Sequence, residues 1–261
     1  MNSNPLPQRS EGLDAQLLYA GVFAFTRARI GVILPSVNTV VEPWFNEVMP
    51  KGVSVHATRM LLRNTLTPQE LRRMDEVDGE CAAVQMASCQ PQAVAYCCTA
   101  SSVVGGLDYD EELRQRLEER VGAPCFTAAS AAIDALRAVG ATRVAIASPY
   151  PTAIDEMEQD FFTSAGFQVV GSANLGISDP FRLADPSPAQ IYDLARDAWT
   201  TEADALLLTC LNMRGHSVVQ ILEEELGKPV ITSTQATLWK ALRMAGIQDA
   251  IHGFGHLLSE H

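Results

Sequence analysis

Two cysteines stand where buried strands end, in positions from which a side chain can react. Cys98 follows the apolar run 93–96, and Cys210 follows the run 205–209. Short apolar runs of this kind predict buried parallel strands, and ligands of open α/β sheets bind at the carboxyl ends of such strands. Cysteine suits both nucleophilic and acid-base chemistry, because its thiolate is strongly nucleophilic and its ordinary pKa of about 8.5 is near neutrality. We therefore expect Cys98 and Cys210 to face one another across a cleft and to work as a pair.

The segments around these cysteines alternate between strand and helix, which predicts parallel sheets with the site at the carboxyl ends of the strands. Strands are expected at 30–34, 53–60, 93–96, 124–127, 143–147, 167–174, 205–209 and 230–232, and helices at 40–48, 67–88, 108–121, 128–139, 152–165, 188–200, 216–226 and 235–244. Residues 97–107 are expected to form a loop that presents the first thiol.

An internal repeat relates the two cysteine strands. Pro35 precedes Cys98 by 63 positions (98 − 35), and Pro149 precedes Cys210 by 61 (210 − 149). Each half offers a strand ending in a proline loop, then a strand and helix, then a strand ending in cysteine. We therefore expect two pseudo-symmetric α/β halves around one central cleft, with chance periodicity as the alternative.

Charge and composition exclude several classes of function. The formal charge of −12 leaves no basic stripe for a nucleic acid. No CxxC motif is present, and the strand loops carry no GxGxxG, which argues against a zinc site and a dinucleotide fold. The six cysteines indicate reduced thiols, and the apolar run 17–25 is too short to span a bilayer. We expect a cytoplasmic protein with no membrane partner.

Five motifs in order resemble the maleate cis-trans isomerases and arylmalonate decarboxylases of the aspartate/glutamate racemase superfamily. They are Leu-Pro-Ser-Val-Asn-Thr-Val-Val-Glu at 34–42, Cys-Thr-Ala-Ser-Ser at 98–102, Ser-Pro-Tyr at 148–150, Thr-Cys-Leu-Asn-Met-Arg at 209–214, and the tail 229–243. The resemblance implies two pseudo-symmetric domains, at 28–124 and 125–229, with 230–261 returning to the first and 1–27 as an N-terminal arm. It also implies that no metal or organic cofactor is used, and that the chain forms a homo-oligomer, a dimer or larger.

The resemblance assigns roles to four residues. Cys98 becomes the nucleophile and Cys210 the acid-base group, while Asn38 and Tyr150 hold carboxylate. The decarboxylases have glycine at the first cysteine position, so Cys98 counts against decarboxylation. A helix beginning after the first cysteine would lower the thiol pKa and favour the anion.

Further donors to a small anionic substrate are expected beside the two thiols. They are the hydroxyls or N–H groups of Ser36, Thr99, Ser101, Leu211 and Asn212, which could stabilise charge developing on a carboxylate. Pro180 stands where maleate isomerases have a substrate-binding asparagine, which leaves the substrate open. Cys97 leaves the register open, because the racemase motif would begin there; the Cys-Thr order of the isomerases favours Cys98.

These observations favour a cofactor-independent isomerase that acts on a small dicarboxylate, with maleate to fumarate as the leading reaction. The alternative is a two-base racemase or epimerase in which one thiol removes the proton next to a carboxylate and the other returns it. A malonate-type decarboxylase and a non-catalytic small-molecule binding protein are the remaining readings.

Overall fold

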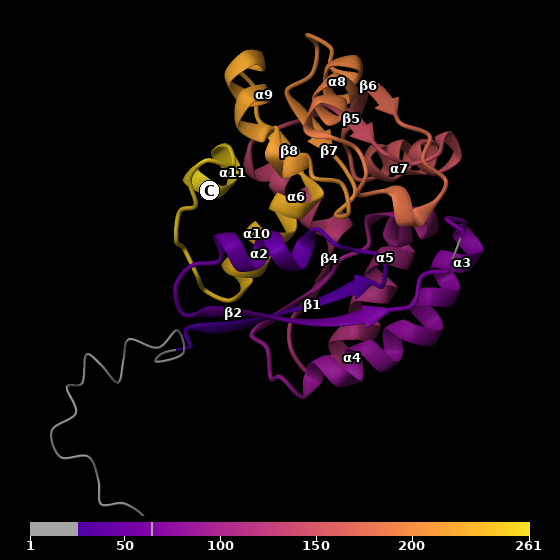
Figure 1. Cartoon of the computed structure of the whole chain (residues 1–261), viewed down its shortest axis with the longest axis vertical. Coiled ribbons are helices and arrows are strands. Elements are labelled where there is room, and N and C mark those ends of the chain that lie inside the picture. Colours follow the sequence, from indigo (N-terminus) through magenta and orange to yellow (C-terminus); the bar gives the residue numbers. More distant parts are fainter. Residues whose placement is uncertain (1–25, 64) are drawn as a thin grey trace, which may run out of the picture.

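The structure is a computed structural model that describes residues 26–63 and 65–261. It contains two four-stranded parallel sheets with corresponding strand orders, β2-β1-β3-β4 and β6-β5-β7-β8. The α/β class and the pseudo-symmetric repeat are therefore confirmed. Figure 1 shows the first sheet below and the second above, with α2 and α10 between them.

The strands of the two sheets match the apolar runs closely. The first sheet contains β1 (Ala28–Pro35), β2 (Val53–Met60), β3 (Ala93–Tyr96) and β4 (Cys125–Thr127); the second contains β5 (Arg143–Ser148), β6 (Gln168–Asn174), β7 (Ala205–Leu208) and β8 (Val230–Thr232). Every residue of β3 and β7 is buried, as continuous apolar runs require in a parallel sheet.

Helices and helical turns connect the strands and cover the faces of the sheets. They are α2 (Val41–Val48), α3 (Pro68–Arg73), the π-helix η1 (Met74–Gly79), α4 (Glu80–Ala87), α5 (Thr99–Val121), α6 (Ala128–Ala138), α7 (Thr152–Ser164), η2 (Pro180–Arg182), α8 (Pro188–Ala198), η3 (Gly215–Ser217), α9 (Val219–Leu226), α10 (Ser233–Met244) and α11 (His256–Glu260). Among the described helices none is long and apolar enough to cross a membrane.

Helix α5 begins nine residues earlier than the sequence indicates, at Thr99 rather than Asp108. Its Gly-Gly pair suggested a loop, yet only Gly106 departs from helical geometry, with φ 79° and ψ 179°. Glycine adopts such a conformation without the penalty that a Cβ brings, so the helix bends there and continues. As a consequence Cys98 is the residue immediately before a helix, and the expected loop at 97–107 is wrong.

The last strand of each sheet lies just beyond the domain boundary expected from the sequence. β4 pairs with β3 in the first sheet, and β8 pairs with β7 in the second. A first domain that ended at residue 124 would therefore lose β4, and a second domain that ended at residue 229 would lose β8. What returns to the first half is helix α10, which packs on β3 and α6. The predicted arm at 1–27 lies almost entirely outside the described residues.

Candidate active site

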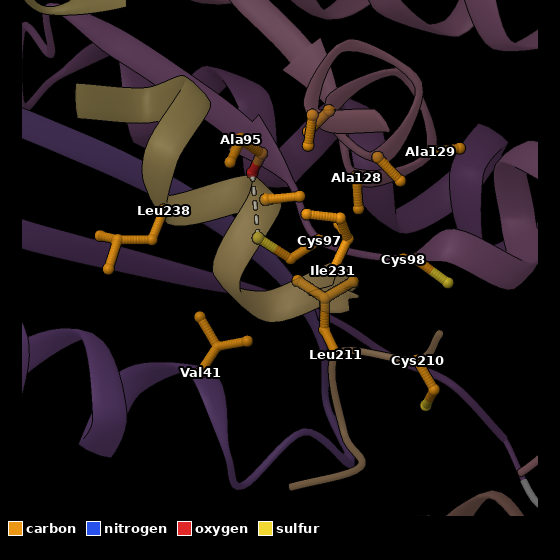
Figure 2. Packing of buried hydrophobic residues seen from close by; sticks show 14 of the residues in the cluster. Val41, Ala95, Cys97, Cys98, Ala128, Ala129, Cys210, Leu211, Ile231 and Leu238 are labelled. Carbon is orange, nitrogen blue, oxygen red and sulfur yellow. Dashed lines mark hydrogen bonds between the residues drawn. The ribbon is translucent and has the colours of Figure 1, made fainter. Parts of the chain in front are cut away.

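A small pocket of about 30 Å³ lies where the carboxyl ends of the two sheets meet. Its walls come from both halves of the chain: Pro35, Val37, Asn38, Leu62, Leu66, Cys97, Cys98, Thr99, Ala100, Tyr150, Leu183, Cys210, Leu211 and Asn212. Both predicted thiols line it, with Cys98 8% and Cys210 5% exposed. Figure 2 shows their side chains directed to the same side. Space of this size holds roughly two water molecules.

Cys97 points away from the paired thiols. It is 1% exposed, and its Sγ donates to Ala95 O at 3.5 Å, on the far side of the strand end from Cys98 (Figure 2). Neighbouring side chains of an extended segment point to opposite faces. The geometry therefore favours Cys98 over Cys97 as the reactive thiol.

The backbone at Cys210 is held in an unusual conformation, with φ of 73°. A side chain in this left-handed region costs about 1–2 kcal/mol, and such outliers cluster at functional sites. Flanking hydrogen bonds hold the turn: Thr209 N donates to Ala147 O at 2.9 Å, and Met213 N to Cys210 O at 3.1 Å. The turn is thus a constrained position from which the thiol enters the pocket.

Burial raises the pKa of both thiols. Desolvation is the largest cause at Cys98, and the nearby Asp75 carboxylate adds to it, whereas a backbone N–H of Ser101 opposes the rise. The pKa of Cys210 rises to about 11, again chiefly by desolvation, and contacts with the Tyr150 hydroxyl and the Asn212 N–H lower it. The start of α5 does not bring the Cys98 pKa below its ordinary value, because the loss of hydration outweighs the helix N-terminus.

Asn38 and Tyr150 both reach the pocket, and Asn38 keeps a donor for a ligand. Asn38 Oδ1 accepts from the N–H groups of Val40 and Val41, both at 3.0 Å, and so caps α2. Its amide Nδ2 has no partner among the described residues. The Tyr150 side chain is 2% exposed, and its hydroxyl lies next to the Cys210 thiol.

The other predicted binding residues divide into two groups. Thr99, Leu211 and Asn212 line the pocket. Ser36 and Ser101 do not: Ser36 Oγ accepts from Leu62 N at 3.2 Å, and Ser101 Oγ donates to Asp75.

The Asn212 side chain is also engaged within the protein. Its Oδ1 accepts from Thr39 N at 2.9 Å, and its Nδ2 donates to Val37 O at 3.2 Å. This amide therefore joins the second cysteine loop to the first proline loop.

Two buried carboxylates beneath the thiols were not anticipated from the sequence. Asp75 on the π-helix accepts from the hydroxyls of Tyr96, Ser101 and Tyr109. Its bonds hold the residues on either side of Cys98, because Tyr96 ends β3 and Ser101 lies in the first turn of α5. π-helical segments occur frequently at functional sites.

Glu158 on α7 is the second of these carboxylates. It is fully buried, its Oε2 lies 2.9 Å from Thr209 Oγ1, and desolvation raises its pKa to about 8. One signal was available, because Glu158 falls on the apolar stripe of α7 together with Ile154, Phe161 and Phe162, at spacings that share a helix face.

The chain is similar to two kinds of enzyme, and the family match extends over most of its length. The family model for arylmalonate decarboxylase matches residues 30–258. The maleate isomerase of Geobacillus stearothermophilus is 27% identical over 245 residues, covering 88% of this chain and 97% of that protein. The arylmalonate decarboxylase of Bordetella bronchiseptica is 31% identical over 165 residues, covering 62% and 69%.

Solved structures agree with these matches. Maleate isomerase Iso of Pseudomonas putida S16, crystallised with maleate as a cysteine-to-alanine variant, superposes with a TM-score of 0.84 at 28% identity, covering 89% of this chain and 97% of that one. A cysteine-to-serine variant of Nocardia farcinica maleate cis-trans isomerase, with a covalently bound succinylcysteine intermediate, gives a TM-score of 0.85 at 27% identity, covering 90% and 99%. The resemblance inferred from the sequence motifs is thereby confirmed, and this chain belongs to the arylmalonate decarboxylase family, in which it is similar to the maleate isomerases.

Proposed function

We propose that this enzyme is a cofactor-independent cis-trans isomerase of a small unsaturated carboxylic acid, with maleate to fumarate as the reference reaction. Cys98 is the nucleophile and Cys210 the acid-base group. The observation that carries the proposal is the presence of two thiols, one from each half of the chain, in one pocket. The maleate isomerase relatives and the succinylcysteine of a similar structure support the same chemistry.

The two thiols are the only protein groups whose covalent bonds change in the reaction. The Cys98 thiolate forms an S–C bond with one alkene carbon, and the π-electron pair moves to the neighbouring carbon, which takes the Cys210 proton. The former double bond is now single and turns by half a revolution. Cys210 then removes a proton from that carbon, the C–H electron pair re-forms the double bond, and the S–C bond breaks with its electron pair returning to sulfur. Nothing is oxidised or reduced.

Charge that develops on the substrate carboxylate needs preorganised donors. In this proposal the Asn38 amide and the Tyr150 hydroxyl supply them, since both line the pocket. The Ser101 N–H and the first turn of α5 favour the Cys98 anion. Because burial raises the pKa of both thiols, we expect the rate to increase as pH rises through neutrality.

Incubation with maleate, followed by measurement of fumarate, tests this function. Cys98→Ser and Cys210→Ser should each lower kcat by at least about 10³-fold, since loss of a catalytic nucleophile or acid removes most of the rate enhancement. Cys97→Ser serves as the matched control and should keep most of the activity. Mass spectrometry of Cys210→Ser should find a succinyl adduct on Cys98.

Other outcomes would decide against the proposal. An adduct on Cys97, or full activity without Cys210, would contradict the assigned roles. Incorporation of solvent deuterium at a chiral carbon of an amino acid, with no alkene isomerised, would favour the two-base racemase. Release of CO₂ from a malonate-type acid by the unaltered enzyme would favour decarboxylation.

A further inference from the structure

The walls of the pocket differ sharply in polarity. Leu62, Leu66 and Leu183 contribute an apolar part, with 3%, 9% and 4% of each residue exposed. The polar part consists of the two thiols, Asn38, Thr99, Tyr150 and Asn212. Of the described residues that line the pocket, none carries a positive charge.

The guanidinium groups close in the chain to the pocket walls are directed to other parts of the protein. Arg63, next to Leu62, lies 4.0 Å from Glu70, and Arg182, next to Leu183, pairs with Asp185 at 3.0 Å. Arg59 donates to Ser36 O at 3.1 Å and Asn38 O at 2.8 Å, and it forms an ion pair with Glu42. Arg214 donates to Ala184 O at 2.8 Å, which fixes the segment that carries Leu183. Both are exposed, so they shape the walls without supplying a buried counter-charge.

Among the described residues of the pocket, donors for a ligand are correspondingly few. The side chains of Ser36, Ser101 and Asn212 already bond within the protein, and Thr99 Oγ1 lies 3.3 Å from Ser233 Oγ. The Asn38 amide remains, together with backbone N–H groups and the Tyr150 hydroxyl, which is shared with the Cys210 thiol. This set is enough for one carboxylate. A second one against the leucines would be a buried charge without a partner, which costs several kcal/mol.

We propose that the pocket takes its substrate as a monoanion: a cis-alkene acid with one free carboxylate, whose other cis substituent is an uncharged acyl group such as a carboxamide or ester. This inference rests on the proposed isomerase function and narrows its substrate class. The neutral acyl group lies against Leu62, Leu66 and Leu183. It also eases the chemistry, since an uncharged carbonyl accepts the displaced π-electron pair more readily than a carboxylate that already carries a negative charge.

A parallel assay of maleate and its half-amide, maleamate, tests the inference at a pH near 8, where maleate is a dianion. We expect kcat/KM for maleamate to exceed that for maleate by at least about tenfold, which corresponds to about 1.4 kcal/mol. Equal or better use of maleate would overturn the monoanion inference while leaving the isomerase function intact.

A binding measurement keeps the two proposals separable. If neither alkene is isomerised, the proposed function fails, and the saturated pair succinamate and succinate then tests charge preference through thermal stabilisation of the protein. Stronger stabilisation by succinate would contradict the inference.

Introducing a cation provides a converse test. Leu183→Arg should shift the preference toward maleate, whereas the matched Leu183→Met should not. An unchanged substrate ratio in a folded Leu183→Arg protein would count against the apolar wall as the determinant.

Discussion

At the scale of single residues, Asn38 shows how one side chain serves structure and function together. Its Oδ1 caps α2 through Val40 N and Val41 N, while its amide nitrogen is left toward the pocket. The sequence motif indicated a carboxylate-binding residue, and the helix that follows indicated a cap. The geometry accommodates both, because an amide carries an acceptor at one atom and donors at the other.

Substitutions at Asn38 should separate these two contributions. Asn38→Asp keeps the capping oxygen but replaces the donor by a second oxygen, so it should lower kcat/KM by about 10- to 100-fold, as loss of a hydrogen bond to a charged group implies, with little change in unfolding free energy. Asn38→Ala should lose both, with about 1 kcal/mol of stability as well. Kinetics and urea unfolding measure the two effects, with exposed Asn46→Asp as control. A stable Asn38→Asp variant with full activity would argue against substrate binding by this amide.

At the scale of elements, each thiol is supported by a buried carboxylate on a different helix. Asp75 on η1 joins the end of β3 to the start of α5, and Glu158 on α7 contacts the residue after β7. These helices are not equivalent in the repeat, because η1 follows the second strand of its half and α7 follows the first. The two cysteines therefore sit on different supports, which suits a pair with different roles.

The buried Glu158 should make stability depend on pH. Its folded pKa of about 8 lies above the ordinary value near 4.3, so between these two values the folded protein holds a proton that the unfolded chain releases. The stabilisation is complete below the unfolded pKa and is lost as pH rises through the folded one, by about 1.4 kcal/mol per pH unit. Glu158→Gln should remove this slope, measured as unfolding free energy from about pH 5 to 9. Exposed Glu156→Gln should retain it, and an unchanged slope in Glu158→Gln would show that this carboxyl is not the source.

The elements could be predicted from sequence to the extent that local pattern determines them. Strands such as β3 and β7 match their apolar runs because burial in a parallel sheet requires continuous apolar character. The start of α5 could not be found this way, since Gly105 and Gly106 locally favour a loop, and packing overrides that preference. Asp75 was missed because a buried carboxylate is recognised by its partners, which come from distant segments. Glu158 left one local signal, its place on the apolar stripe of α7.

At the scale of the whole molecule, one amide links the two halves across the pocket. Asn212 follows the second thiol, yet it bonds to the backbone of Val37 and Thr39 in the first half. The repeat predicted that the two loops would meet, and the pocket confirms it. Spacing in the chain does not tell which side chains join the loops and which face a ligand. That depends on the three-dimensional geometry.

Removing this link should loosen the pocket. Asn212→Ala should cost roughly 2 kcal/mol of stability for two lost hydrogen bonds, one of which leaves the Thr39 N–H without its acceptor. It should also speed alkylation of Cys98 by iodoacetamide at fixed pH, because the enclosing loops are no longer held. Denaturant unfolding and mass-resolved alkylation measure these effects, with exposed Gln220→Ala as control. Slower alkylation of Cys98 in Asn212→Ala would mean that this amide does not hold the pocket closed.

The packing of α10 on β3 has a consequence for how the protein is made. A nascent chain that has left the ribosome only as far as β4 has all four strands of the first sheet, but the helix that covers part of β3 is still to be synthesised. The face of the first half is therefore complete only after α10 has been made. The two pocket thiols likewise come together only after Cys210 has been made, so a product interrupted before β7 carries Cys98 but lacks the second wall of the pocket.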